Sequence, residues 1–132
     1  MWIEENGGAG MGKILKFEYY EKDKLNTRVQ VDYSRQEILV ENFTDDIVEQ
    51  AFGRRKVTIE TIDEFFRERV FPETRVNCKE LLEDLGLRNF DAEAIARITH
   101  GVLVHDFNWI RFDDEKLSWE DILEFKAGLM KE

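Results

Sequence analysis

The sequence predicts an α+β fold, a three-stranded antiparallel meander covered by about four short helices, and two patterns carry this prediction. In residues 15–19 and 27–33, apolar and β-branched side chains fall on every second position, which is the period of a half-buried strand. From residue 58 onward, apolar side chains recur three and four positions apart between capping residues and glycines, as in short amphipathic helices. A sheet with one apolar face needs cover, so the helices are expected to pack on that face.

The strands are expected in the first third of the chain. The run 27–33 places Val29 and Val31 on one face and charged or amide side chains on the other. Residues 15–19 alternate in the same way before it, and residues 38–40 form a third short run after it. The two polar links between these runs are short enough for hairpins, which favours an antiparallel meander.

The first helix is expected to begin after Thr58, whose side chain is of the type that caps helix N-termini, and to run through Arg69. Thr61 and Glu64 have the spacing of a capping box three residues later. Pro72, the only proline of the chain, ends this helix because proline cannot continue it.

Three more helices are expected after the proline. Thr74 is placed to cap the second helix, and Gly86 supplies the left-handed residue that follows its end. Asp91 caps the third helix, which ends at Gly101. Ser118 begins the fourth, because the acidic residues that follow it favour a helix N-terminus.

The segment Val102–Phe112, between the third and fourth helices, is expected to be a short strand or an ordered loop. Alternation would place Phe107, Trp109 and Arg111 on one side, and Asn108, Ile110 and Phe112 on the other. One of these two sides is expected to pack in the core, and the other is a candidate contact surface.

Composition points to one globular domain in a reducing compartment. Residues 1–10 carry three glycines and no period, so we interpret them as a flexible leader before a single domain over 11–132. A content of 42% hydrophobic residues excludes a disordered acidic tail. The single cysteine excludes an intrachain disulfide framework, and the sequence has neither a signal peptide pattern nor an apolar run of the roughly 20 residues that span a bilayer. A cytoplasmic location is therefore expected.

Catalytic signatures are missing, so we expect a protein that is not an enzyme and that needs no cofactor. The sequence has no phosphate loop, no nucleophile elbow, no zinc-binding helix and no dinucleotide fingerprint. The glycine-rich run 7–13 resembles a phosphate loop, but it lacks a preceding strand and a Ser or Thr after the lysine.

Three groups of reactive residues leave alternatives open. His100, His105 and Asp106 are candidate ligands for a divalent metal, although a helix end lies between the two histidines. Cys78 lies on the apolar stripe of the second helix, about one turn inside it, which favours a core cysteine over a nucleophile. A general acid–base pair would come from Asp106 with Asp113 or Asp114, and nothing in the sequence distinguishes these from solvated acids.

The acidic charge is the strongest clue to function. The formal net charge is −10, residues 41–50 hold four acids and no basic residue, and residues 106–124 hold seven acids against two basic residues. Direct nucleic-acid binding is disfavoured because it needs a basic stripe, and the only sharp basic run is residues 54–56. An acidic domain attracts basic surfaces, and one that occupies a nucleic-acid-binding groove would act as a mimic and inhibitor. The alternative is that the acidity only maintains solubility.

The candidate partner-binding residues are the acids of these two stretches and one tryptophan, because Trp is enriched at the centres of protein interfaces. They are Glu41, Asp45, Asp46, Glu49, Asp106, Trp109, Asp113, Asp114, Glu115, Glu120 and Asp121.

The second half also carries a spaced pattern: Glu68-Arg69-x-x-Pro72-x-Thr74-Arg75, then Leu85-Gly86, then Asp106-x-x-Trp109, then Leu117-x-Trp119-x-Asp121. Over residues 60–122 this pattern resembles the segment that precedes the kinase-like portion of HipA-like proteins of Firmicutes. The resemblance implies no catalytic residue for this chain, because the kinase motifs lie outside the segment. It leaves Arg69, Arg75, Asp106 and Trp109 as members of an ion-pair and indole network or of a docking site.

The leading hypothesis is an acidic, non-enzymatic interaction protein from a phage or mobile element. It would bind a basic, nucleic-acid-processing protein and inhibit or modulate it, as anti-CRISPR proteins and antitoxins do. The alternatives are a stand-alone accessory module of a HipA-like kinase in a toxin–antitoxin type of system, and a small metal-dependent enzyme.

Overall fold

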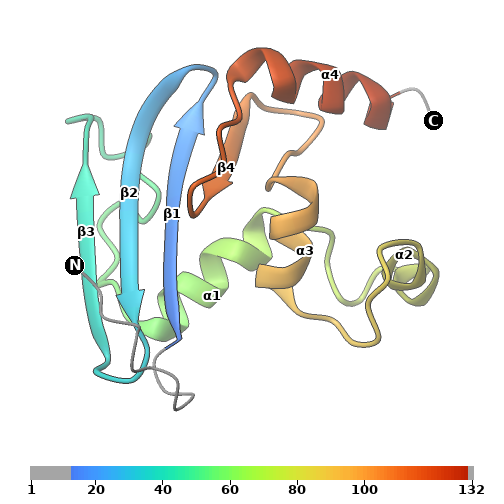
Figure 1. Cartoon of the computed structure of the whole chain (residues 1–132), viewed down its shortest axis with the longest axis horizontal. Coiled ribbons are helices and arrows are strands. Elements are labelled where there is room, and N and C mark those ends of the chain that lie inside the picture. Colours follow the sequence, from blue (N-terminus) through green and yellow to red (C-terminus); the bar gives the residue numbers. More distant parts are fainter. Residues whose placement is uncertain (1–12, 131–132) are drawn as a thin grey trace.

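A four-stranded antiparallel sheet organises the computed structural model, which describes residues 13–130 (Figure 1). Its strands are β1 (Ile14–Glu21), β2 (Lys24–Asp32), β3 (Glu37–Asn42) and β4 (Asn108–Phe112), in the spatial order β3-β2-β1-β4. The helices are α1 (Ile59–Glu68), α2 (Cys78–Asp84), α3 (Ala92–Thr99) and α4 (Trp119–Met130). The predicted leader over residues 1–10 lies outside the described residues, as does the glycine-rich run up to residue 12.

The predicted α+β fold and its meander are confirmed, but the prediction of three strands was wrong by one. The segment Val102–Phe112, which was predicted to be either a short strand or an ordered loop, contains β4. This strand pairs antiparallel with β1, so that Phe112 lies opposite Phe17 and Asn108 opposite Glu21. Because β4 lies far along the chain from its partner, no hairpin signal announces the pairing. The fourth strand makes β1 an inner strand and leaves β3 and β4 as the two edges.

One face of the sheet packs on α1 and α3 and forms the main core. Phe17 of β1 lies at the centre of an aromatic group, with ring centroids 5.7 Å from Phe65, 5.0 Å from Phe66 and 6.1 Å from Phe112. Burial of these aromatic side chains is the main driving force for placing α1 across the sheet.

The opposite face is covered at its β1–β4 side by α4. Trp109 has an exposed fraction of only 1%, because its indole stacks on Tyr20 at 4.7 Å between centroids and packs with Ile122 of α4. The indole Nε1 donates a hydrogen bond to the carbonyl of Lys22 over 2.7 Å, which ties β4 to the β1–β2 hairpin. The helices therefore lie on both faces of the sheet.

The remainder of that face carries a charge ladder across all four strands. Arg28 binds Glu41 of β3 at 3.3 Å and Glu18 of β1 at 2.9 Å, and Glu18 also binds Arg111 of β4 at 2.6 Å. Burial acts to raise the pKa of Glu18, but the hydrogen bonds from Arg111 and Arg28 hold that pKa below its usual value. Opposite charges that alternate across strands stabilise the sheet and neutralise this face.

The ends of α1 and α2 test the predicted caps. Thr58 caps α1 as predicted, accepting the Thr61 N–H over 3.1 Å. The predicted capping box of Thr61 and Glu64 was wrong, because Thr61 lies in the first turn and its hydroxyl donates to the Lys56 carbonyl over 2.8 Å. Gly86 closes α2 as predicted, with φ +79°.

The start of α2 differs from the prediction. The residue before the helix is Asn77 rather than Thr74, and its side chain makes no capping hydrogen bond. Residues 72–78 instead form successive turns, in which the Arg75 N–H donates to the Pro72 carbonyl and the Cys78 N–H to the Arg75 carbonyl, each over 3.0 Å. The helix α2 is therefore about one turn shorter than predicted. Cys78 is its first residue, whereas the prediction placed Cys78 about one turn inside the helix.

Candidate interaction surface

The first acidic stretch forms a fixed turn between β3 and α1, which we call the acidic turn (residues 44–49). The Asp46 N–H donates to Thr44 Oγ1 over 3.1 Å, and Asp46 Oδ1 accepts the Val48 N–H over 3.0 Å. Asn26 of β2 donates from Nδ2 to the Glu49 carbonyl over 3.2 Å. These bonds hold the turn against the start of β2, as short polar side chains do in tight turns.

The acidic turn presents apolar side chains to solvent among carboxylates. Val48 has an exposed fraction of 91% and Ile47 one of 38%. Glu49 binds Lys24 at 3.0 Å, whereas neither Asp45 nor Asp46 has a basic partner within ion-pair distance among the described residues. An apolar centre with a polar rim is the usual anatomy of a protein–protein interface.

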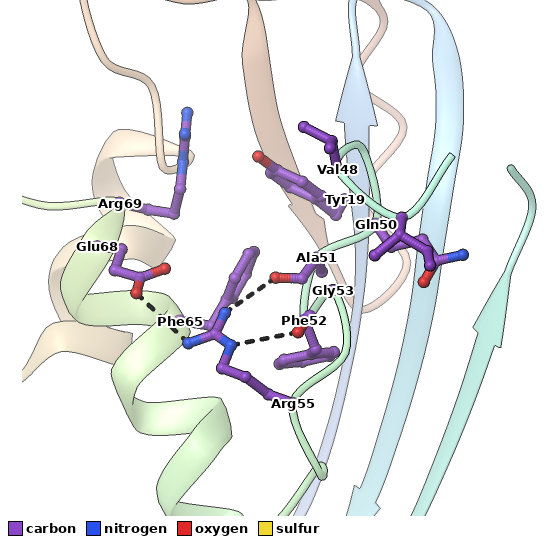
Figure 2. Close-up of a pocket in the computed structure, with 11 residues that line it drawn as sticks. Tyr19, Val48, Gln50, Ala51, Phe52, Gly53, Arg55, Phe65, Glu68 and Arg69 are labelled. Carbon is purple, nitrogen blue, oxygen red and sulfur yellow. Dashed lines mark hydrogen bonds and ion pairs between the residues drawn. The ribbon is translucent and has the colours of Figure 1, made fainter. Parts of the chain in front are cut away.

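A pocket of about 440 Å³ opens between the acidic turn and α1, and Figure 2 shows Val48 and Tyr19 at its upper end. On its α1 side, Arg55 donates to the carbonyls of Phe52 and Ala51 over 3.2 Å each and to the Glu68 carboxylate over 3.4 Å, as the dashed lines in Figure 2 mark. The lining residues are Tyr19, Ile47, Val48, Gln50, Ala51, Phe52, Gly53, Arg55, Phe65, Glu68 and Arg69.

The pocket combines an aromatic wall with an ion pair. Tyr19 meets Phe65 edge-on at 5.0 Å between centroids, and the Arg69 guanidinium lies 5.7 Å from the Tyr19 ring centre. Burial raises the pKa of Tyr19 above its usual value. This arrangement suits the binding of a long side chain with an apolar stem and a polar end.

The second acidic stretch is largely engaged in local structure. Asp113 binds Arg97 of α3 at 2.8 Å, and Glu115 Oε1 accepts the Phe112 N–H over 2.8 Å. Asp121 Oδ2 accepts the Ser118 N–H over 2.9 Å, which confirms Ser118 as the start of α4. Of this stretch, Asp114, Glu120 and Glu124 are exposed and have no hydrogen bond or ion pair from their side chains to described residues.

The two acidic stretches differ in what surrounds their unpaired carboxylates. Glu41 is held in the charge ladder by Arg28, and Glu49 by Lys24. Both stretches keep carboxylates without a basic partner among the described residues, but only those of the acidic turn, Asp45 and Asp46, lie next to Val48 and the pocket. We therefore place the candidate contact surface at the acidic turn and its pocket.

Asp106 belongs to a buried ion-pair network, which removes it from the candidate contacts. The Arg69 guanidinium binds both Asp106 carboxylate oxygens, over 2.9 and 3.0 Å, and also donates to the carbonyls of Gly101 and Asn108, each over 3.0 Å. Arg69 has an exposed fraction of 7%. Desolvation acts to raise the pKa of Asp106, but the Arg69 hydrogen bonds and charge hold it below its usual value.

Trp109 is likewise a correction to the predicted contact set. Its side chain is buried beneath α4, so it stabilises the fold and is not available to a partner. Of the four residues that the spaced pattern left as a network or a docking site, Arg69 and Asp106 form an ion pair that connects α1 to β4, and Trp109 is buried next to it. The fourth, Arg75, is exposed in the turns before α2.

The candidate metal ligands do not converge. His100 is the left-handed residue that ends α3, with φ 60°, and its ring meets Phe125 edge-on at 5.2 Å. His105 is exposed, and both Asp106 oxygens accept from Arg69. Within residues 13–130, no group of three His, Cys, Asp or Glu side chains is arranged to hold a metal ion. Cys78 is half-buried and packs at the edge of the main core.

The apolar part of the candidate surface was missed from the sequence. Ile47 and Val48 follow two acids and precede a third, in a segment with neither helical nor strand period. An apolar pair that fits no amphipathic pattern is the signal that would have marked them.

Comparisons with known proteins add no relative. No protein-family model, no curated protein and no solved structure matches the chain. The resemblance to the HipA-like segment therefore stays a prediction. No helix in the described part of the chain is long and apolar enough to cross a membrane.

Proposed function

We propose that this protein is a non-enzymatic interaction module that binds a basic, nucleic-acid-processing protein and inhibits or modulates it, in the manner of anti-CRISPR proteins and antitoxins. The observation that carries the proposal is the acidic turn, where a valine with an exposed fraction of 91% lies between uncompensated carboxylates and a pocket. Ile47 lies beside this valine, so the turn combines adjacent apolar side chains with a polar rim, as protein interfaces do.

Electrostatic attraction supplies the first step of binding. A net charge of −10 draws a cationic surface by long-range attraction. On the sheet face, the charge ladder pairs Glu18 and Glu41 with arginines, so that face adds little to the field. The carboxylates of Asp45 and Asp46 have no such partner among the described residues, so they orient the partner toward the acidic turn.

Apolar contact supplies the second step. Burying the Val48 side chain in a complementary hollow of the partner contributes about 1.5–3 kcal/mol. The pocket beside it accepts a side chain in return, and an arginine or lysine from the partner would place its stem against Tyr19 and Phe65. Its charged end would then lie near the Glu68 carboxylate, which Arg55 already shares.

The test is binding to purified nucleases and other basic nucleic-acid-binding proteins, measured by titration calorimetry over a range of salt concentrations. We expect wild-type affinity to fall as salt rises, because exposed charges are screened. An Asp45→Asn, Asp46→Asn double variant keeps the acceptor for the Val48 N–H and is expected to flatten that salt dependence.

Val48→Ser isolates the apolar contribution, and Val76→Ser is its matched control because Val76 is a fully exposed valine of the segment before α2. Val48→Ser is expected to weaken binding at every salt concentration, whereas Val76→Ser leaves it unchanged. Binding that ignores salt, or equal effects of the two valine variants, would contradict the proposal.

A further inference from the structure

The outer edge of β3 is a second surface with the means to bind. β3 pairs with β2 along one side, and no described residue pairs with its other side. Natural edge strands are commonly protected by charged side chains, lysine above all, by proline or by a bulge. Residues 37–42 contain neither lysine nor proline, the register of β3 against β2 is continuous, and the only charges on the strand are the acids Glu37 and Glu41.

The backbone groups that face outward can be assigned from the pairing. The Phe43 N–H donates to the Asn26 carbonyl over 2.8 Å, so residue 43 directs its backbone groups toward β2. Direction alternates along a strand, so Leu39 and Glu41 also face β2. Ile38 and Val40 therefore direct their N–H and C=O groups away from the sheet, where an added strand would meet them.

The side chains of the edge specify the partner. Glu41 lies on the charge-ladder face, and alternation places Glu37 and Leu39 on that same face. Leu39 has an exposed fraction of 62%. Ile38 and Val40 lie on the opposite face, half-buried against the core. The edge thus presents an acid, an apolar residue and an acid at every second position. The two acids lie 3.8 Å from Arg35 and 3.3 Å from Arg28, and their side chains keep exposed fractions of 60% and 61%, so both stay open to a further cation.

A second copy of this chain is disfavoured in the register centred on Leu39. Antiparallel pairing of two β3 strands centred on Leu39 would place Glu37 of each copy opposite Glu41 of the other. Like charges directly opposite one another destabilise a strand pair, and each chain carries a net charge of −10.

We infer that the β3 edge accepts an extended segment of the basic partner as a fifth, antiparallel strand. The segment would alternate Lys or Arg, any residue, an apolar residue, any residue, and Lys or Arg, so that its cations lie opposite Glu37 and Glu41 and its apolar residue opposite Leu39. The inference rests on the proposed function in taking the partner to be basic.

A seven-residue probe tests the inference directly. The acetylated, amidated peptide Thr-Lys-Val-Leu-Val-Lys-Thr places its two valines opposite Val40 and Ile38 in the antiparallel register. N-methylation of both valines removes the N–H groups that would face β3, whereas N-methylation of the central leucine removes one that faces away. We expect the unmodified and leucine-methylated peptides to bind, by fluorescence anisotropy, and the valine-methylated peptide to bind at least about tenfold more weakly.

Two variants of the protein give the reciprocal test. Val40→Pro removes an N–H that β2 does not use, and proline is tolerated in an edge strand when its nitrogen faces away from the sheet. Should this variant fold poorly, Glu37→Lys tests the charge match instead, with Glu83→Lys on α2 as the control of equal charge change. Val40→Pro and Glu37→Lys are expected to weaken peptide binding at least about tenfold, and Glu83→Lys to have no comparable effect.

The outcomes separate this inference from the proposed function. Equal binding of the two methylated peptides, or Glu37→Lys and Glu83→Lys indistinguishable from each other, would overturn strand addition. If the free protein formed a dimer and Val40→Pro dissociated that dimer, the edge would belong to a second copy of the chain. This result would also overturn the inference that the edge binds the partner. Val48→Ser is expected to leave peptide affinity unchanged while it weakens binding to a basic protein, so each proposal can fail alone.

Discussion

Replacing Asp106 by asparagine is expected to destabilise the fold substantially, although the change is nearly isosteric. The carboxylate holds the Arg69 guanidinium through two hydrogen bonds, over 2.9 and 3.0 Å. Asparagine keeps one oxygen acceptor but loses the charge. Arg69 has an exposed fraction of 7%, so its positive charge would be left buried with only neutral acceptors, which are the asparagine oxygen and the carbonyls of Gly101 and Asn108.

The size of the effect follows from the burial of the pair. Removing one partner of a fully buried ion pair costs about 3–5 kcal/mol. The Asp106 side chain has an exposed fraction of 30%, so water replaces part of the lost interaction. We therefore expect the free energy of unfolding to fall by about 2–3 kcal/mol, a large share of the roughly 5–15 kcal/mol that stabilises a domain.

Urea denaturation followed by circular dichroism measures this difference, and its pH dependence tests the cause. The pKa of Asp106 is lowered in the folded state, so its stabilising contribution is complete above the carboxyl pKa of the unfolded chain. That contribution is lost as pH falls through the lowered folded pKa, so wild type and Asp106→Asn should converge in acid. Asp113→Asn, which breaks the exposed pair with Arg97, is the control and should cost less than about 1 kcal/mol. Equal costs for the two variants, or a difference unchanged in acid, would refute the reasoning.

Three further substitutions probe other parts of the fold, each by urea denaturation. Gly101→Ala should lower the free energy of unfolding by about 2–4 kcal/mol, because φ is +63° and the new methyl group would lie 2.7 Å from Ile110 Cδ1. The control Gly86→Ala has φ +79° but open space around it, so it should lower that free energy by only about 1–2 kcal/mol. Equal losses for the two variants would contradict this reasoning. Trp109→Phe should cost about 1–3 kcal/mol, because the Lys22 carbonyl loses the indole donor, and an unchanged stability would show that this bond contributes nothing. Glu18→Gln should cost about 1–3 kcal/mol, since two arginines lose a shared carboxylate, and a cost no larger than that of Asp113→Asn would argue against the charge ladder.

Local signals in the sequence predicted most of the elements. Alternation placed Val29 and Val31 on the core face, and Thr58 and Ser118 mark the starts of α1 and α4 as expected. These features succeed because a cap or a two-residue period depends on neighbours along the chain. Thr74 failed as a cap because turns of the backbone after Pro72 delay α2, and propensity gives no information on such turns.

Non-local contacts account for what the sequence did not show. The pairing of β4 with β1 joins residues far apart in the chain, so no local pattern announces it. The ion pair between Arg69 and Asp106 was one of two alternatives left open by the spaced pattern, and only the fold decides between them. Acid counts treated Asp106 and Asp113 alike as surface charge, yet each has an arginine partner in the fold. The exposure of Val48 depends on how the turn is anchored to β2, which the sequence expresses only as an apolar residue outside any period.

The most direct measurement of the central claim is a hydrogen-exchange footprint of this protein, free and bound to a basic protein identified by the binding assays. We predict that the partner slows exchange of the amides in residues 44–53, which form the acidic turn and the adjoining side of its pocket. Protection confined to α2 and the turns before it, with residues 44–53 unchanged, would contradict the account.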